Sequence, residues 1–192
     1  VPREEGFIES QGCDVHYFRW GNPENPPLIL MHGFLAHARC MAFIAPFLAE
    51  NYHVVAYDLT GMGDSGVRDA YPDSVRAQEV VDVAQKTGLF EHAQKPIIIA
   101  HSYGGHVGLT AMNEHHSLFG GLIICDLMVL RLERLKAHFA GGRPLRSDPN
   151  RPNRVYPDYA AAKARFVLSP NQPCGFLILC TLTILSMLML LE

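Results

Sequence analysis

The 192-residue sequence contains no Cys-x-x-Cys pair and no His-Glu-x-x-His stretch, and its ten histidines show no metal-ligand spacing. These absences argue against a zinc site, so we expect no metal and no other cofactor. The five cysteines form no even-numbered framework, which is typical of a reduced, cytoplasmic chain. A large excess of one charge is also missing: the net charge is −3, and we expect no nucleic-acid partner.

The first residues, "VPREEGF", lack an apolar stretch, and we therefore expect no secretory signal. Charge is nevertheless uneven along the chain. Residues 129–170 hold nine Lys or Arg against three acidic residues, a local net charge of +6. This segment is either a solvated, irregular face or a basic lid that favours acidic substrates or a membrane surface.

Predicted strands and helices alternate through most of the chain, which is long enough for one domain. The expected strands are residues 6–10, 14–20, 28–31, 52–58, 96–100 and 121–125, the first two joined as a hairpin through Gln11-Gly12. The expected helices are residues 74–87, capped by Asp73 and closed by Gly88, and residues 104–114, with further helical spacing at Cys40, Phe43, Ile44, Phe47 and Leu48. The alternation between residues 28 and 126 predicts an α/β fold, a mostly parallel sheet with helices on both faces. Within the last apolar run, Cys125 is expected to be a buried free thiol.

The alternation stops beyond residue 126. We expect a core over residues 1–128, a cap or lid over 129–170 and an atypical tail over 171–192. In the cap, residues 131–139 are a candidate short helix, 141–157 a loop, and Asp158 the cap of a helix that reaches about Phe166.

The tail contains an uncharged apolar run over residues 175–191, and three interpretations of it are open. It is a truncated or frame-shifted terminus, or a membrane anchor about 26 Å long as a helix, or a replacement core strand formed by "GFLILC". The expected truncation would explain the abrupt change in composition.

The stretch "IIIAHSYGG" at 97–105 ends a predicted strand on Ser102 and continues into a helix that opens with two glycines. Ala100 and Gly104 are small residues two positions before and after the serine. This is the spacing of the nucleophile elbow, in which a strained turn lifts a serine hydroxyl above the carboxyl ends of the strands.

A second motif, "LILMHGF", ends the first expected parallel strand at His32-Gly33. The N–H of Phe34 is then placed to point into the same crevice as the N–H of Tyr103. Two such donors would form an oxyanion hole, which stabilises the developing negative charge in acyl transfer.

Together, "HGF", "DLTGMGDS" and "AHSYGG" resemble the α/β-hydrolase superfamily, in its serine-esterase or lipase-like branch, over about residues 6–126. The resemblance implies a serine hydrolase that cleaves carboxylic esters or similar acyl bonds of small molecules through an acyl-enzyme. Ser102 would be the nucleophile, and Phe34 and Tyr103 would supply the oxyanion hole. The turn from Asp58 to Ser65 would be a structural feature beside the site. A serine at 102 argues against the dehalogenase and epoxide-hydrolase branches, which use a carboxylate.

A rival interpretation of the glycines at 61, 63 and 66 is a dinucleotide fingerprint, G-x-G-x-x-G. That fingerprint needs a helix that opens at the glycines, whereas here the expected helix begins near residue 74. We therefore favour the turn over nucleotide binding.

The histidines leave the base of a catalytic triad unassigned. His32 is expected to fix the turn of the oxyanion loop, His101 to point away from Ser102, and His115-His116 to end a helix. In this family the order is Ser, then Asp or Glu, then His on a loop after a late strand. The histidines after Ser102 are His106, His115, His116 and His138, and none stands on such a loop.

Asp126 ends a strand and is a candidate acid, although a structural role suits it better. The alternative to an active esterase is therefore an inactive or truncated homologue that lacks the catalytic histidine and acts at most as a binding module.

Overall fold

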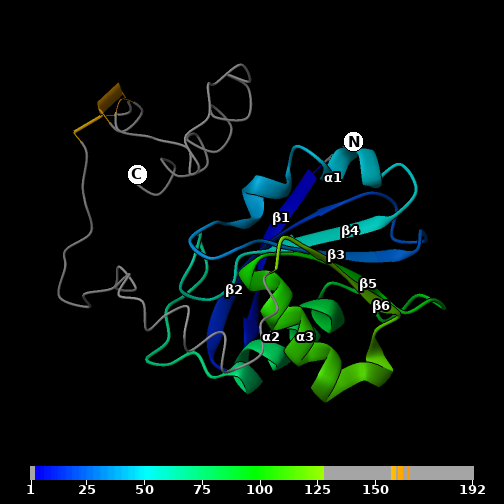
Figure 1. The fold of residues 1–192 in the computed structure, drawn as a ribbon. Helices are drawn as coiled ribbons and strands as arrows, with labels where there is room; N and C mark the ends of the chain where they lie inside the picture. The colour runs from blue at the N-terminus through cyan, green and yellow to red at the C-terminus, as the bar shows by residue number, and fades with distance from the viewer. Residues whose placement is uncertain (1–2, 128–156, 159, 162–163, 165–192) are drawn as a thin grey trace. The chain divides into compact units, whose positions relative to one another are not determined.

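The computed structural model describes residues 3–127, 157–158, 160–161 and 164 (Figure 1). The chain divides into two compact units, and one boundary between them falls between residues 127 and 128. The strands of the described part are β1 (Arg3–Ser10), β2 (Cys13–Trp20), β3 (Pro27–Met31), β4 (His53–Tyr57), β5 (Ile97–His101) and β6 (Gly121–Cys125). The helices are η1 (Ala38–Met41), α1 (Ala45–Leu48), α2 (Asp73–Lys86), α3 (Tyr103–His115) and η2 (His116–Leu118), where η marks a 3₁₀ turn.

The six strands form one sheet in the order β1-β2-β4-β3-β5-β6. The strands β4, β3, β5 and β6 run parallel, and β1 and β2 are antiparallel to their neighbours. The expected hairpin turns at Gln11 and Gly12, both with positive φ (47° and 77°), as a two-residue turn requires. The predicted mostly parallel α/β sheet is confirmed.

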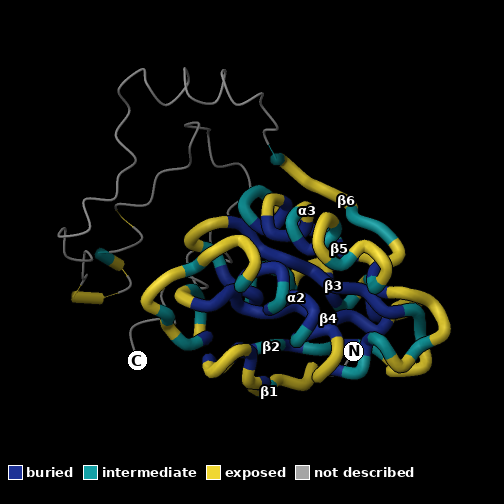
Figure 2. The backbone as a smooth tube through the Cα atoms, turned by 90° about the horizontal axis from the view of Figure 1, so that it is seen from below, coloured by how far each residue is buried: buried dark blue, intermediate teal, exposed yellow. Residues whose placement is uncertain are grey.

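Helices cover both faces of the sheet, as predicted. Every residue of β3 and β4 is buried, as the tube view shows for the centre of the sheet (Figure 2). Alternate residues serve opposite faces: Ile29 and Val55 belong to the core shared with α2 and α3, whereas Leu30 belongs to the core shared with η1 and α1. The two-sided burial explains why these strands are continuous apolar runs in the sequence.

The continuous helix suggested by the spacing over residues 40–48 is wrong. The segment forms the 3₁₀ turn η1 and the four-residue helix α1, with Phe43 and Phe47 exposed. Pro46 lies in the first turn of α1, where its missing N–H costs nothing, but it prevents a helix from running through from residue 40.

Two further local predictions also need correction. Asp73 is the first residue of α2 and makes no capping hydrogen bond; its carboxylate bonds to His106 instead. Cys125 is exposed rather than buried, because β6 pairs only with β5 among the described strands. Gly88, with φ of 81°, follows the end of α2 as predicted.

One expectation for residues 129–170 is confirmed by the described residues. The N–H of Ala161 donates to Asp158 Oδ1 at 2.8 Å, so Asp158 caps the start of a helical segment as predicted. The other expectations for residues 129–170, and those for the run 175–191, lie outside the described residues. Within the part of the chain that is described, no helix is long and apolar enough to cross a membrane.

Candidate active site

Ser102 lies between the end of β5 and the start of α3, at the predicted strand-to-helix turn. Its backbone has φ of 50° and ψ of −116°, a conformation that is strained for a residue with a side chain. Two backbone hydrogen bonds hold it there: the N–H of Ser102 donates to the carbonyl of Cys125 at 2.9 Å, and its own carbonyl accepts from Gly105 at 2.8 Å. The strain is therefore retained by β6 on one side and by the first turn of α3 on the other.

Small residues around Ser102 are required by packing. A Cβ on Gly104 would lie 2.5 Å from the carbonyl oxygen of His32 and 3.0 Å from Cβ of Met31. Ala100, two residues before the serine, is fully buried. The start of α3 thus packs directly on the end of β3, closer than a side chain would allow.

The loop after β3 touches Ser102 itself. A Cβ on Gly33 would lie 3.2 Å from Cβ of Ser102 and 2.8 Å from Nδ1 of His101. The next residue, Phe34, stacks edge-on against Tyr103, with the ring centroids 5.8 Å apart. The fold therefore brings together the three residues that the sequence singles out as nucleophile and oxyanion-hole donors.

His32 fixes this loop, as predicted. Its Nε2 accepts a hydrogen bond from the N–H of Leu59 at 3.1 Å, so its proton is on Nδ1, which donates to the carbonyl of Gly33 at 2.8 Å. Burial lowers the pKa of His32 to about 4, against an ordinary value of 6.5. The imidazole is thus neutral at physiological pH and has no nitrogen left for proton transfer.

The turn from Asp58 to Ser65 packs beside this loop as a structural element. Gly63 has φ of 57°, and a Cβ there would lie 2.2 Å from Cγ of Asp58. Ser65 Oγ donates to the carbonyl of Asp58 at 2.6 Å, which closes the turn. No helix opens at the glycines, because α2 begins only at Asp73. The geometry therefore does not have the form of a dinucleotide-binding loop.

Asp58 is the buried centre of a polar cluster that the sequence does not reveal. Its carboxylate bonds to His16 Nδ1 at 2.8 Å and accepts the N–H groups of Ala38 at 2.5 Å and Asp64 at 3.0 Å. Burial would raise the pKa of Asp58, but these hydrogen bonds outweigh it and the pKa lies below its ordinary value.

His16, Asp58 and Asp64 also offer ligand atoms within 4.8 Å of one another, the spacing of a metal site. However, Asp64 already binds the guanidinium of Arg39 at 2.9 Å, and three donors occupy Asp58. His16 and Asp58 thereby form a buried link between β2 and the turn after β4, and the Asp58 carboxylate also holds the start of η1 through Ala38. Because His16 and Asp58 are 42 residues apart, no local pattern in the sequence marks the pair.

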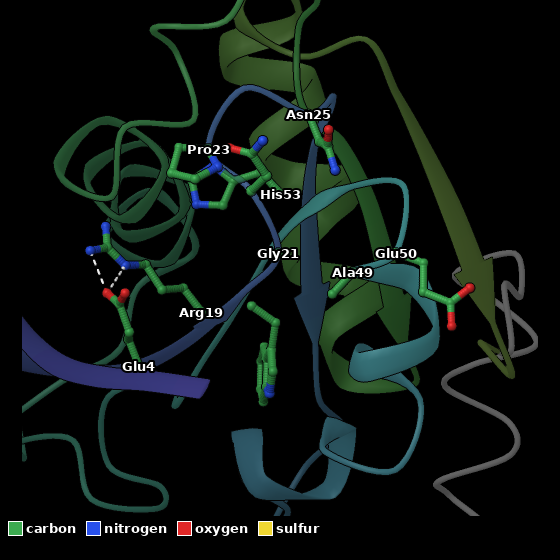
Figure 3. A pocket seen from close by; sticks show the side chains of 10 residues that line it. Glu4, Arg19, Gly21, Pro23, Asn25, Ala49, Glu50 and His53 are labelled. Carbon is green, nitrogen blue, oxygen red and sulfur yellow. Dashed lines mark hydrogen bonds and ion pairs between the residues drawn. The ribbon is translucent and has the colours of Figure 1, made fainter. Parts of the chain in front are cut away.

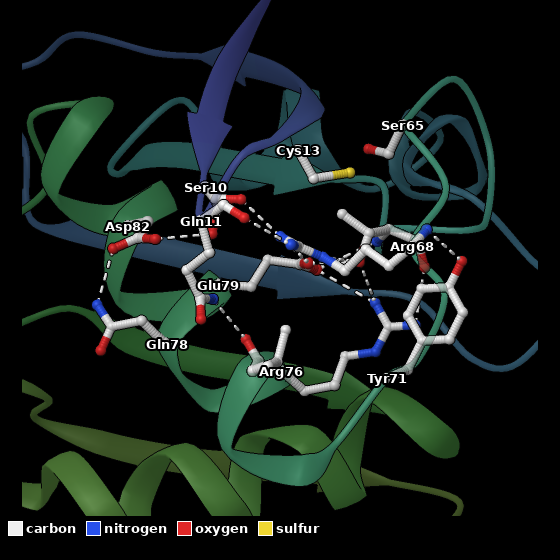
Figure 4. A network of polar contacts seen from close by, with 12 residues as sticks. Ser10, Gln11, Cys13, Ser65, Arg68, Tyr71, Arg76, Gln78, Glu79 and Asp82 are labelled. Carbon is white, nitrogen blue, oxygen red and sulfur yellow. Dashed lines mark hydrogen bonds and ion pairs between the residues drawn. The ribbon is translucent and has the colours of Figure 1, made fainter.

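A second buried network joins α2 to the same turn (Figure 4). Glu79 is fully buried; its carboxylate accepts the hydroxyl of Thr60 at 2.6 Å and a bond from Arg76 at 3.3 Å. Burial raises the pKa of Glu79, although Thr60 and Arg76 act in the opposite direction. Arg68 extends the network to the β1–β2 hairpin by donating to the carbonyl oxygens of Ser10 and Gln11. The network therefore ties α2 and the β1–β2 hairpin to the turn that follows β4.

Two histidines that are close to Ser102 in the sequence, His101 and His106, each lie near a carboxylate. His101 Nε2 lies 3.8 Å from Asp126, the candidate acid, which is exposed and has φ of 56°. His106 Nε2 lies 3.1 Å from Asp73 Oδ1, within hydrogen-bond distance. His115 ends α3 as predicted, and His138 lies outside the described residues.

Two hollows of about 600 Å³ each lie at the opposite end of β4 from the site. Both are lined in part by Arg19, Pro23 and His53, and the first is drawn in Figure 3. In that hollow the guanidinium of Arg19 is already paired with Glu4 at 2.5 Å. Ser102 lines neither hollow, since it stands at the carboxyl ends of the parallel strands and His53 at an amino end.

Comparison with known proteins matches residues 28–182 to the alpha/beta hydrolase family. The uncharacterized hydrolase YugF of Bacillus subtilis is 27% identical over 115 residues, 59% of this chain and 41% of YugF. Epoxide hydrolase 3 of Xenopus tropicalis is 25% identical over 128 residues, 64% of this chain and 34% of that protein. The chain thus spans less than half the length of these relatives. A thioesterase domain from the curacin biosynthetic pathway superposes with a TM-score of 0.72 at 22% identity, covering 97% of this chain and 67% of the domain.

Proposed function

The chain belongs to the alpha/beta hydrolase family, and on this premise we propose that it hydrolyses carboxylic esters, or similar acyl bonds of small molecules, through an acyl-enzyme on Ser102. The observation that carries the proposal is the strained backbone of Ser102, held at the end of β5 in contact with Gly33. A strained backbone of this kind persists only where the surrounding structure holds it in place, and such residues cluster at active sites.

The proposed reaction has two halves. The Ser102 hydroxyl attacks the carbonyl carbon, its proton passes to a base, and the N–H groups of Phe34 and Tyr103 stabilise the oxyanion. The leaving alcohol then departs with a proton, and water releases the acid from the acyl-enzyme. Exposed Phe34, beside Tyr103, would contact the apolar part of the substrate.

A serine at the elbow supports ester chemistry over epoxide chemistry, although one relative is named an epoxide hydrolase. Epoxide opening in this family uses a carboxylate nucleophile, as the resemblance implies. We therefore expect p-nitrophenyl butyrate, and not styrene oxide, to be turned over.

The test is labelling of the purified chain with a fluorophosphonate, with the modified peptide identified by mass spectrometry and esterase turnover measured in parallel. We expect the label on Ser102, and we expect Ser102→Ala to lose both label and turnover. Ser117→Ala is the matched control, since Ser117 is an exposed serine of η2 away from the site. Esterase activity that survives Ser102→Ala would overturn the proposal.

A second candidate is a non-catalytic binding module that keeps the crevice. It is favoured by one observation, namely that among the described residues no histidine follows β6, the last strand. Folded chain that takes no fluorophosphonate label would support this function in place of the first.

A further inference from the structure

The loop after β3 contains another strained residue close to Ser102. Leu35 has φ of 57°, in the left-handed region that a bulky side chain rarely adopts. It lies two residues after Gly33, where a Cβ would be 3.2 Å from Cβ of Ser102. The side chain of Leu35 is 69% exposed, so its packing does not account for the conformation. The cause lies in the backbone of the turn.

The hydrogen bonds of the loop identify the type of turn. The N–H of Ala36 donates to the carbonyl of Gly33 at 3.2 Å, so Phe34 and Leu35 are the two central residues. A positive φ at the second central residue, with none at the first, is the pattern of a type II turn. Glycine normally fills that second position, because it adopts a positive φ at no steric cost. Leucine in its place leaves the turn strained.

Hydrogen bonds at both ends hold the turn in this form. The carbonyl of Gly33 accepts a second bond, from Nδ1 of His32 at 2.8 Å. Beyond the turn, the N–H of Ala38 donates to the buried carboxylate of Asp58 at 2.5 Å. The C=O and N–H of a trans peptide point in opposite directions, so the two bonds to the Gly33 carbonyl also fix the direction of the Phe34 N–H. Among the described residues that N–H has no hydrogen-bond acceptor, which leaves it available to an oxyanion.

The turn has a competing form that leucine adopts readily. A type I turn keeps the bond from Ala36 to Gly33 but has a negative φ at both central residues. The two forms differ by a rotation of about 180° of the peptide between Phe34 and Leu35, which exchanges the places of its carbonyl oxygen and its N–H. This peptide adjoins the Phe34 N–H, so the exchange changes the electrostatic field at an oxyanion bound there.

We propose that Leu35 is a positioning residue of the oxyanion hole and that the left-handed form of its backbone is the reactive one, an inference that rests on the proposed ester function. The left-handed residue keeps the Phe34 carbonyl oxygen turned away from the oxyanion, and the donor is in place before the substrate arrives. The contribution comes from the backbone of Leu35 and not from its side chain. The strain of the turn is thus offset by stabilisation of the transition state.

The experiment compares Leu35→Asn, Leu35→Ala and Leu35→Val in the whole chain. Asparagine adopts the left-handed conformation more readily than other residues with a side chain, whereas β-branched valine is poorly suited to it. We expect the second-order rate of Ser102 labelling by diisopropyl fluorophosphate to fall in the order asparagine, alanine, valine, by about fivefold or more from first to last. With p-nitrophenyl acetate the same order should appear in kcat, while KM stays constant within about twofold, because the oxyanion forms only after the substrate is bound.

Leu109→Asn and Leu109→Val are the matched controls, since Leu109 is an exposed leucine within the helix α3. Both should label within about twofold of the unmodified chain, as surface substitutions away from a strained backbone usually have small effects. Urea unfolding followed by the emission of Trp20 verifies that each variant is folded under the conditions of labelling.

The choice of variants separates the backbone of Leu35 from its side chain, because valine keeps the apolar character and asparagine keeps the size and the left-handed preference. A rate for Leu35→Val that equals or exceeds that of Leu35→Asn, or a difference below about fivefold, overturns the inference while the ester function stands. An order that appears in KM rather than in kcat also overturns it and assigns the side chain to substrate binding. An unmodified chain that takes no label overturns the proposed function and the inference together.

Discussion

Replacing His32 with glutamine is expected to remove a large part of the loss of stability on acidification. His32 has a pKa of about 4 in the folded protein and 6.5 in the unfolded chain, because burial disfavours its charged form. As the pH falls through this window, the unfolded chain binds the proton first. The stability that His32 contributes is therefore complete above pH 6.5 and is lost progressively down to pH 4.

The magnitude follows from the gap between the two pKa values. At about 1.4 kcal/mol for each pKa unit, His32 accounts for about 3 kcal/mol of unfolding free energy over the whole window, and about 2 kcal/mol between pH 7 and pH 4.5. Glutamine does not titrate here, yet it offers one donor for Gly33 and one acceptor for Leu59. Its own effect on packing is the same at both pH values and cancels from the difference.

The assay is urea unfolding at pH 7 and pH 4.5, followed by the emission of Trp20, the single tryptophan, which is 3% exposed. We expect the unmodified chain to lose about 2 kcal/mol more than His32→Gln between the two pH values. His116→Gln, at an exposed histidine, is the control and should behave like the unmodified chain. Equal losses in the unmodified chain and His32→Gln would refute the assignment of a buried, neutral imidazole.

Three further substitutions test the packing around the site. Gly63→Ala should cost at least about 2 kcal/mol in chemical unfolding, because a Cβ there would lie 2.2 Å from Cγ of Asp58 in a left-handed backbone. Arg76→Leu should cost about 3–5 kcal/mol, since it removes the nearer of the two guanidinium groups beside the buried carboxylate of Glu79 and leaves only Arg68, 3.9 Å away. Adding Glu79→Gln should recover part of the loss, and thermal melts of the single and double variants measure this. Gly104→Ala should slow fluorophosphonate labelling while leaving the helix content, measured by circular dichroism, nearly unchanged. The reason is that its Cβ would lie 2.5 Å from a carbonyl oxygen of the loop after β3. Labelling at the rate of the unmodified chain would count against the close packing.

The sequence predicts the parts of the fold that short-range rules govern. The strands β3 and β4 are buried on both faces, so they are uninterrupted apolar runs that are easily recognised. The turn at Ser102 is marked by small residues at fixed distances along the chain, because close packing there excludes a Cβ. The pattern of neighbouring residues in the sequence is therefore sufficient to predict these elements.

Partners that are distant in sequence could not be predicted in the same way. The bond between Asp73 and His106 joins residues 33 apart, and a rule based on neighbouring residues assigns Asp73 to a helix cap instead. The spacing over residues 40–48 indicates a helix, but Pro46 and the packing of η1 divide it. Cys125 follows an apolar run, yet its burial depends on what pairs with β6, which apolar character alone does not report.

The order of strands in the sheet has a consequence for synthesis on the ribosome. Once β4, which ends at residue 57, has left the ribosome, the strands β1, β2, β4 and β3 can pair, but β3 then lies at the edge of that sheet. Its neighbour β5 is finished only at residue 101, a delay of roughly 2 to 9 seconds at about 5–20 residues per second. During that interval an entirely apolar strand presents unpaired backbone groups to its surroundings or to a chaperone. The nascent chain is therefore most vulnerable to aggregation before the strand that carries the nucleophile elbow has been made.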